Sequence, residues 1–330
     1  MGLGERGRKA VRMMSAMPDV RVAALCDSNA DNIEAVAAYG DSRTLRTAGA
    51  EAYRYVCRSA DVDLVYVCTD WSTHATIALE ALRCGKHVAV EVPAALTLDD
   101  IEALVAAAAA SGRECFMLEN CCFDERLLEA TERIRRGEIG EVVHAEGNYY
   151  HELASRWTPW RLEINRQRRG DLYPTHEIGP ICKALDIGVS DELQTLVCMD
   201  SAPIAGRQTY ERALRREAPD FASGDHTTTL IRTRRGRTIV LRHDVMTVQS
   251  YERTLTFIGT AGRITIEDAG KDSHEVMTRA MNRHLVEALL NGRSPGISVC
   301  DMARWCAVVP LSEQSIQRGF APVEFRYNNE

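Results

Sequence analysis

The stretch VDLVYVCTDWSTHATIALEALRCGKHVAVEVP, residues 62–93, decides the fold of this chain. Its two ends, residues 62–70 and 86–93, are apolar runs with the length of buried strands. Residues 73–84 between them carry a helical pattern that reaches Gly85, where a helix can stop. A strand, a helix and a second strand in this order predict a parallel βαβ unit.

The same alternation extends over the first 122 residues. Apolar runs at 20–27 and 115–120 predict two further strands, and residues 28–39 and 97–111 predict two further helices. We therefore expect an α/β, Rossmann-type domain at 1–122, built on a doubly wound parallel sheet. The strand that should precede the first glycines is missing, which reflects either an internal start or a variant that makes a poor cofactor fold.

A different pattern begins near residue 142. Longer strand-like segments joined by turns follow one another: VVHAEGNYYHEL, ELQTLVCMD, HTTTLIRT, RTIVLRHDV and RTLTFIGT. They predict an α+β domain at 123–330 with a mostly antiparallel sheet, which would bind substrate and form oligomers. The helical stretches at 275–291 and 300–318 are expected to pack back on the first domain.

Composition excludes several classes of function. The 330 residues carry a formal net charge of -7, which argues against general binding of nucleic acid or acidic membranes. The eleven cysteines include no CxxC pair and lie mostly in apolar segments, so we expect buried thiols, a reducing compartment and no metal site. With no membrane-spanning run and no visible signal peptide, we expect a cytoplasmic protein, unless the start is incomplete and an export signal has been lost.

The first glycines form a dinucleotide-binding pattern. GLGERG has the G-x-G-x-x-G spacing at Gly2, Gly4 and Gly7, which lets a pyrophosphate approach a helix N-terminus. A chance glycine-rich start would explain this motif alone, but a helical stretch follows and Asp27 ends the next strand. A carboxylate there accepts hydrogen bonds from both ribose hydroxyls and repels a 2′-phosphate, which favours NAD over NADP.

Several separated motifs together resemble one known family. They are KHVAVEVPAAL, MLENCCFD, GEVVHAEGNYYHEL, WRLEINRQRRGDLYPTHEIGPIC and PLSEQSIQRGFAPVEF. These segments are similar to glycoside hydrolase family 109, the NAD-dependent alpha-N-acetylgalactosaminidases, within the superfamily of glucose-fructose oxidoreductase and inositol dehydrogenase. In the wider superfamily the second motif reads E-K-P, with a lysine that helps proton transfer, and Val92 stands at that position here.

The resemblance implies a reaction and a set of contacts. The reaction is hydrolysis of a terminal alpha-N-acetylgalactosamine by transient oxidation at C3, elimination at C1 and addition of water, with retention. The implied NAD contacts, beyond the three glycines, are Glu5, Arg6, Asp27, Trp71, Ser72, Thr73, His74, Glu91, Val92 and Asn120. The implied sugar contacts are Tyr149, Arg161, Tyr173, Pro174, Thr175, His176 and Tyr251.

Proton transfer in this chemistry needs a side chain that both accepts and donates a proton near neutral pH. Histidine does so, and we expect His176 and Tyr173 to form the acid–base pair, without dividing the steps between them. A two-carboxylate mechanism remains open, with Glu146, Glu152, Glu163 and Asp171 as candidates. Four histidines in strand patterns are expected to be structural or rim residues: His144, His151, His226 and His243.

One departure from the family and two rival functions stay open. Glu177 stands where the family has a glycine after the histidine, and its carboxylate would raise the pKa of His176 or bind a different substrate group. The rivals are an NAD-dependent sugar dehydrogenase with net redox turnover, and a degenerate, non-catalytic protein that binds sugar or nucleotide. The expected partner is a small-molecule glycoside or glycan terminus, and the expected state is a homo-oligomer.

Overall fold

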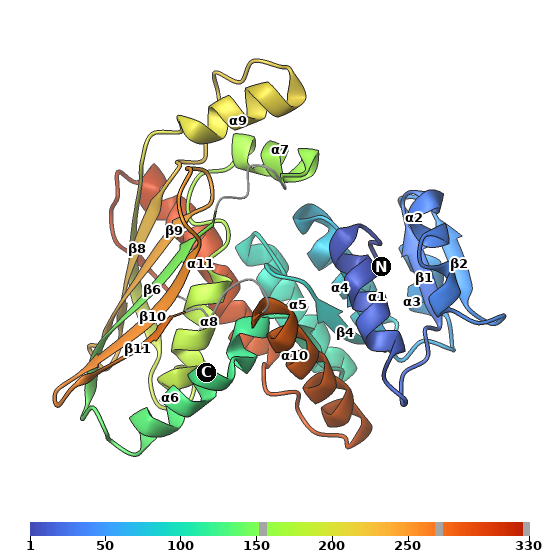
Figure 1. Ribbon diagram of the computed structural model, residues 1–330, viewed down its shortest axis with the longest axis horizontal. Coiled ribbons are helices and arrows are strands. Elements are labelled where there is room, and N and C mark those ends of the chain that lie inside the picture. Colours follow the sequence, from blue (N-terminus) through green and yellow to red (C-terminus); the bar gives the residue numbers. More distant parts are fainter. Residues whose placement is uncertain (152–156, 268–272, 326–330) are drawn as a thin grey trace. The chain divides into compact units, whose positions relative to one another are not determined.

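A computed structural model describes residues 1–151, 157–267 and 273–325 (Figure 1). The chain forms two compact units. The first consists of Met1–Glu119 with Glu275–Ala303, and the second of Asn120–His274 with Arg304–Glu330. The single boundary at residue 122 stays a prediction. Within the described ranges, no helix is long and apolar enough to cross a membrane.

The first unit contains the parallel strands that the sequence predicts. Strands β1 and β2 pair in parallel, and β3, β4 and β5 form a second parallel sheet in that order. The strands are β1 Ala24–Asp27, β2 Leu45–Ala48, β3 Leu64–Val67, β4 His87–Val90 and β5 Cys115–Met117. The helices are α1 Glu5–Ser15, α2 Ala30–Glu34, α3 Tyr53–Arg58, α4 Trp71–Arg83, α5 Leu98–Ser111 and α10 Ser273–Leu290.

Met1 and Gly2 lie where the first strand was expected. The backbone N–H of Gly2 donates to the Cys26 carbonyl at 3.0 Å, and the Met1 carbonyl accepts from the N–H of Cys68 at 2.8 Å. The described residues include no strand before α1. These two residues therefore connect the edge of β1 to the edge of β3 by backbone hydrogen bonds, and the parallel strands divide into two sheets.

Local sequence explains both ends of helix α5. Thr97 caps α5 by accepting a hydrogen bond from the N–H of Asp100, and Gly112 ends it with a φ of 62°. The helix predicted at 28–39 is wrong in extent, because α2 stops at Glu34 and a separate 3₁₀ turn follows at Ala37–Tyr39. The break lets Val36 enter a buried apolar cluster formed with Leu3, Leu25 and Ile33.

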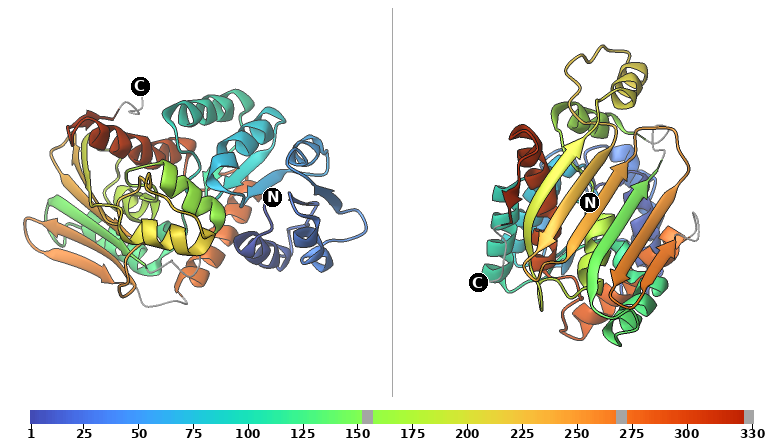
Figure 2. Two further views of the ribbon diagram at one scale, coloured as in Figure 1. Left: turned by 90° about the horizontal axis from the view of Figure 1, so that it is seen from above. Right: turned by 90° about the vertical axis from the view of Figure 1, so that its left-hand side faces the viewer.

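The second unit is built on a seven-stranded sheet in the order β11-β10-β6-β9-β8-β7-β12. Only β6 and β9 pair in parallel among these described strands, which confirms the mostly antiparallel prediction (Figure 2). The strands are β6 Val142–Tyr150, β7 Leu193–Asp200, β8 Thr227–Thr233, β9 Thr238–Asp244, β10 Glu252–Gly259, β11 Arg263–Glu267 and β12 Val323–Glu324. The helices are α6 Glu125–Arg135, α7 Pro159–Gln167, α8 Thr175–Ala184, α9 Ala205–Leu214 and the greater part of α11 Val299–Gln317, with a 3₁₀ turn at Asn120–Phe123. The residues of α11 up to Ala303 belong to the first unit.

Helices α6 and α8 pack against one face of this sheet, which we call the inner face (Figure 1). Alternation along β6 directs Ala145, Gly147 and Tyr149 to the inner face, where all three are buried. Gly147 has no side chain, and this allows Glu177 of α8 to approach: a Cβ at residue 147 would lie 2.8 Å from the Cβ of Glu177.

We expect Gly147→Ala to lower the free energy of unfolding by about 1–3 kcal/mol, because the added methyl group overpacks the contact between β6 and α8. Denaturant unfolding of the variant and the wild type at one pH measures the difference. An unchanged transition midpoint would contradict the close packing of Glu177 on Gly147.

Candidate active site

Strand register gathers polar side chains on the inner face of the second unit. Tyr149 of β6 is the Cα partner of Arg253 on β10 and of His243 on β9. All three residues are buried. The neighbouring row of the same face, Leu255, Gly147 and Leu241, carries no polar side chain. The chain thus places one polar row across three adjacent strands of an otherwise apolar surface.

The start of α8 brings the predicted acid–base pair to this row. Pro174 is the N-cap of α8, so His176 lies in its first turn and Tyr173 just before it. The rings of Tyr173 and His176 meet edge to face, with centroids 4.9 Å apart. Tyr149 lies 5.3 Å from the His176 ring and stacks on His243 at 5.8 Å. Four rings from three elements therefore form one cluster.

The other predicted sugar contacts lie near this cluster or on α7. Tyr251 meets His151 edge to face at 4.9 Å, and the His151 ring lies 6.2 Å from that of Tyr149. Thr175 is fully buried on α8. Arg161 is on α7, with its guanidinium 5.0 Å from the centre of the Trp160 ring. The structure thus brings Tyr251 into a chain of ring contacts with Tyr149.

Burial shifts the protonation of several groups in this region. Desolvation lowers the pKa of His243 to about 4, so its imidazole is neutral at pH 7, and its Nε2 has no hydrogen-bond partner among the described residues. Desolvation raises the pKa of Tyr149 and raises that of Asp171 to about 7. A buried neutral imidazole with an unused nitrogen suits hydrogen bonding to an uncharged ligand.

The raised pKa of Asp171 has a measurable consequence for stability. The native carboxyl keeps its proton up to about pH 7, whereas the unfolded one releases it near its ordinary value of 3.8. Wild-type stability therefore loses a contribution of roughly 3–4 kcal/mol as pH rises from 4 to 7. Asp171→Asn has no such carboxyl, so its stability relative to wild type should rise over that range. Urea unfolding between pH 4.5 and 8 measures this difference, and a pH-independent difference would contradict the raised pKa.

The candidate carboxylates of the alternative mechanism lie in different surroundings. Glu146 points away from the inner face and binds Arg242 at 2.9 Å. Glu163 lies on α7 and binds Arg166 at 2.6 Å, and this bond lowers the pKa of Glu163 to about 2. Glu152 lies outside the described residues. Glu177, which is not one of these candidates, is buried against Gly147. Its expected effect on the pKa of His176 stays a prediction.

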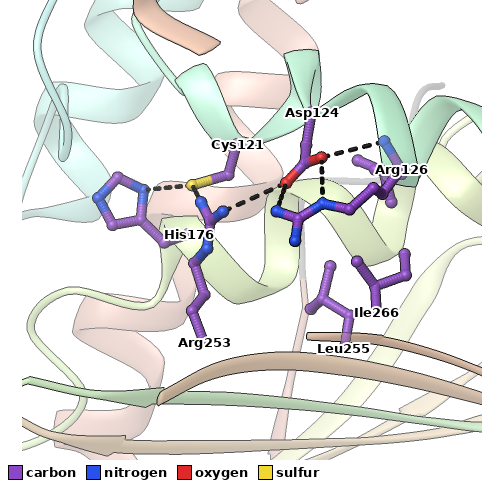
Figure 3. A pocket seen from close by; sticks show the side chains of 8 residues that line it. Cys121, Asp124, Arg126, His176, Arg253, Leu255 and Ile266 are labelled. Carbon is purple, nitrogen blue, oxygen red and sulfur yellow. Dashed lines mark hydrogen bonds and ion pairs between the residues drawn. The ribbon is translucent and has the colours of Figure 1, made fainter. Parts of the chain in front are cut away.

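A pocket opens beside the ring cluster (Figure 3). Its lining residues are Cys121, Asp124, Arg126, Leu127, His176, Arg253, Leu255 and Ile266. Nη1 of Arg253 donates to Sγ of Cys121 at 2.6 Å, and the same Sγ lies 3.5 Å from Nδ1 of His176. Nη2 of Arg253 also pairs with Asp124 at 3.3 Å. His176 thus lies between the ring cluster and a charged, hydrogen-bonded group.

The predicted cofactor residues of the first unit fit a dinucleotide. Gly4 is the N-cap of α1 and provides no side-chain cap, and a Cβ placed on it would meet nothing within 4 Å. A Cβ on Gly7 would lie 1.8 Å from the carbonyl oxygen of Gly2. Gly7 therefore permits the tight turn, while Gly4 leaves open space at a helix N-terminus, which is where a pyrophosphate binds.

The other predicted cofactor residues of the first unit lie at or just after the ends of β1 and β4, or in the first turns of α1 and α4. Asp27 ends β1 and its carboxylate accepts hydrogen bonds from the N–H groups of Leu3 and Asn29. Arg6 and Glu91 form an ion pair between α1 and the end of β4. Trp71, Ser72, Thr73 and His74 form the first turn of α4, Glu5 is the first residue of α1, and Val92 is buried after β4.

His74 and Asn120, two more predicted cofactor residues, also contact other parts of the protein. Both ring nitrogens of His74 contact carbonyl oxygens, Nδ1 that of Pro93 at 2.8 Å and Nε2 that of Thr69 at 3.0 Å. Asn120 belongs to the second unit, where its Nδ2 donates to the carbonyl of His274 at 3.2 Å. Cofactor contacts for these two residues, as for the other predicted cofactor residues, stay predictions.

His243 and Arg253 belong to the candidate site by geometry but were not among the predicted site residues. The sequence predicts His243 as a structural or rim residue and gives no prediction for Arg253. The sequence did carry a signal for both residues. On β9, His243 continues the alternation that buries Ile239 and Leu241 on the inner face. On β10, Arg253 stands in the same alternation as the buried Leu255 and Phe257. A basic side chain on an apolar strand face is costly to bury, which marks it as a candidate for function.

The fold and the residues at its strand ends define a two-unit protein with an NAD-binding Rossmann domain. Residues 1–119 match the model of the oxidoreductase family with the NAD-binding Rossmann fold, and residues 124–269 match the C-terminal domain of glycosyl hydrolase 109. Glycosyl hydrolase family 109 protein 1 of Phocaeicola vulgatus is 34% identical over 98% of this chain and 82% of its own length. Protein 1 of Bacteroides thetaiotaomicron is 33% identical over the same shares. The chain belongs to glycosyl hydrolase family 109.

Solved structures share the fold at low sequence identity. Myo-inositol dehydrogenase from Lactobacillus casei, in complex with NAD(H) and myo-inositol, is 17% identical with a TM-score of 0.79, over 100% of this chain and 96% of its own. Myo-inositol 2-dehydrogenase from Lactobacillus plantarum is 14% identical with a TM-score of 0.82, over 98% of both chains. The family model over residues 1–119 describes an NAD-binding Rossmann fold, so NAD is the cofactor of this protein. The chain is thus an NAD-dependent member of glycosyl hydrolase family 109.

Proposed function

We propose that this protein hydrolyses terminal alpha-N-acetylgalactosamine residues, with NAD as a resident cofactor that is unchanged at the end of each turnover. The observation that carries the proposal is the ring cluster of Tyr149, Tyr173, His176 and His243 at the start of α8. It combines aromatic surface for the apolar face of a sugar with two groups that can exchange protons.

The proton transfers are assigned to side chains of the cluster. Bound NAD would supply a reversible acceptor for the hydride on C3 of the sugar. Loss of that hydride gives the transient ketone that the reaction requires. The ketone makes the proton on C2 acidic, and His176 with Tyr173 removes it. The C1 group then leaves by elimination, and water adds to C1 of the resulting enone as C2 regains a proton. The hydride returns to C3, so the net reaction is hydrolysis. We leave the individual proton transfers undivided between His176 and Tyr173, because their rings are in direct contact.

The surroundings of other acid–base candidates support this assignment. Val92 stands where the wider superfamily carries a lysine, and a buried valine cannot move a proton. Glu146 and Glu163 are held by arginines, which favours the ionised form and disfavours a general acid. The two-carboxylate mechanism would need one raised and one ordinary pKa at the glycosidic bond, a pattern that these two glutamates do not offer. Asp171 does have a raised pKa, but its side chain is fully buried and accepts a hydrogen bond from Thr229, so it is not open to a glycosidic oxygen.

Sugar binding is assigned to the aromatic rings and to two polar groups. Tyr149, Tyr173 and Tyr251 supply ring faces and hydroxyls, and Arg161 supplies a fixed fork of donors for sugar oxygens. The neutral His243 would bind a sugar hydroxyl through Nε2. These assignments require the sugar to lie at the start of α8, with C2 next to His176.

The experiment that tests the proposal separates it from both rivals. Purified protein is denatured and the supernatant assayed for NAD, and native protein is incubated with an aryl alpha-N-acetylgalactosaminide. We expect bound NAD, release of the aglycone and no net formation of NADH. Net accumulation of NADH with a sugar would instead identify a dehydrogenase. A protein that neither retains NAD nor turns over would be the non-catalytic binding protein.

A further inference from the structure

Asp171 is a fully buried carboxyl that the proposed proton transfers do not use, and it lies two residues before Tyr173. The backbone N–H of Tyr173 donates a hydrogen bond to this carboxyl. An aspartate that accepts from the N–H two residues further along the chain closes an Asx turn, which fixes the backbone between the two residues. The turn therefore sets the place from which the Tyr173 ring extends, just before α8.

Two elements of the second unit hold Asp171 itself. The N–H of Asp171 donates to Oγ of Ser312 on α11 at 2.9 Å, and the Ser312 hydroxyl donates to the carbonyl of Val309 at 2.8 Å. The hydroxyl of Thr229 on β8 donates to Oδ2 of Asp171 at 3.3 Å. Gly170 permits the close approach to α11, because a Cβ there would lie 2.7 Å from Oγ of Ser312. Asp171 is thus fixed at its backbone by α11 and at its side chain by the sheet.

The basic run just before Asp171 is fixed to α11 and to the sheet as well. Nη2 of Arg168 pairs with Oε2 of Glu313 on α11 at 2.6 Å. Nε of Arg169 pairs with Oδ2 of Asp200 at the end of β7, also at 2.6 Å. These contacts restrict the segment that leads into α8, so the hydrogen bond from Tyr173 to Asp171 is in place before any substrate binds.

Two other roles for Asp171 fit the structure less well. As a general acid it would have to reach the glycosidic oxygen, but its side chain is fully buried. As a merely structural side chain it would be costly, because burial raises the pKa of its carboxyl to about 7 and an apolar side chain would avoid that desolvation. A costly carboxyl beside the acid–base pair indicates a role in placing that pair.

We propose that Asp171 is a positioning residue, which holds Tyr173 against the His176 ring through the hydrogen bond that its carboxyl accepts from the Tyr173 N–H. The inference rests on the proposed function, because it takes Tyr173 and His176 as the acid–base pair. Asp171 acts through Tyr173 and touches no reacting atom.

Kinetics of Asp171→Leu and Asp171→Asn in the full-length, NAD-loaded protein test the proposal. Leucine keeps much of the volume but has no acceptor, so this variant should lose roughly 10- to 100-fold in kcat, with KM changed far less. Asparagine should recover most of the loss, because its amide oxygen can accept from the Tyr173 N–H. Wild-type kcat in Asp171→Leu, or equal losses in the two variants, would overturn the positioning role.

Asp191→Leu is the matched control for loss of a buried carboxyl. Asp191 is buried and accepts from the N–H of Glu192 at 2.8 Å. It precedes the start of β7, whereas the ring cluster lies at the other end of these strands, where His243 pairs with Thr227. The control should lose stability but keep kcat within about threefold. A loss of kcat as large as that of Asp171→Leu would mean that destabilisation alone explains the effect, and would overturn the proposal.

A second measurement separates failure of this inference from failure of the proposed function. The amide spectrum of ¹⁵N-tyrosine-labelled protein reports the contact without any turnover, with the Tyr173 signal identified by its loss in Tyr173→Phe. Because burial raises the pKa of the Asp171 carboxyl to about 7, the wild-type Tyr173 signal should move between about pH 6 and pH 8. Other titratable groups that face Asp171, His226 and Cys198, are present in Asp171→Asn too, so the difference between the two proteins isolates the carboxyl. A Tyr173 signal with the same pH dependence in both proteins would overturn the contact, whether or not the protein cleaves glycosides.

Discussion

His176→Gln is expected to lower kcat on an aryl alpha-N-acetylgalactosaminide by roughly 10²- to 10⁴-fold, the usual contribution of a positioned acid–base group. Glutamine fills much of the same volume and can hydrogen-bond, but it cannot exchange a proton near neutral pH. KM and the content of bound NAD should change little, because the other three rings of the cluster and the first unit stay intact. Steady-state kinetics and an NAD assay on the denatured protein measure these quantities.

His144→Gln is the matched control for this prediction. His144 also lies on β6, where its ring contacts Thr238 at 2.7 Å and Glu146 at 3.2 Å, and it has no place in the proposed chemistry. Its variant should keep kcat within a few-fold of wild type. Full activity in His176→Gln, or equal losses in both variants, would remove His176 from the reaction.

Gly4→Ala is expected to weaken NAD binding by at least about tenfold, which corresponds to about 1.4 kcal/mol, while leaving folding almost unchanged. The backbone of Gly4 has a φ of -64°, which any residue adopts, and an added Cβ meets no protein atom within 4 Å. The methyl group would instead occupy the space through which a pyrophosphate reaches the first turn of α1. Calorimetric titration of NAD into cofactor-free protein measures the change.

Gly7→Ala provides the contrast, because its Cβ would lie 1.8 Å from the Gly2 carbonyl oxygen. This variant should lose stability whether or not NAD is present, and thermal unfolding measures the loss. If Gly4→Ala binds NAD as tightly as the wild type does, the pyrophosphate does not bind at this helix.

The fold was predictable because local signals agreed with one another. The βαβ stretch at 62–93 became β3, α4 and β4, and the caps at Thr97 and Gly112 define α5 as expected. Strand β2 and helix α3 were not predicted, because both are short. In β2, two of the four residues are exposed and the other two are only partly buried. Short elements depend on tertiary contacts, here the parallel pairing of β2 with β1, and periodicity cannot reveal those.

The candidate site was only partly accessible from the sequence. Tyr173 and His176 are close along the chain, so one motif identifies both. His243, Arg253 and Cys121 are far apart along the chain and meet through strand register and the turn before α6. Register is set by pairing across the whole sheet, which a single sequence does not reveal. Each of these three residues, read alone, fits an ordinary buried side chain.

The central claim is that hydrolysis proceeds by oxidation and elimination, and one isotope measurement tests it directly. Cleavage in heavy water removes the C2 proton and returns a hydrogen from solvent, so the released N-acetylgalactosamine should carry deuterium at C2. Free sugar incubated with the protein under the same conditions corrects for exchange after release. Mass spectrometry and proton NMR of the product give the result. Deuterium at C2 is the predicted outcome, and release of aglycone with only protium at C2 would contradict the account.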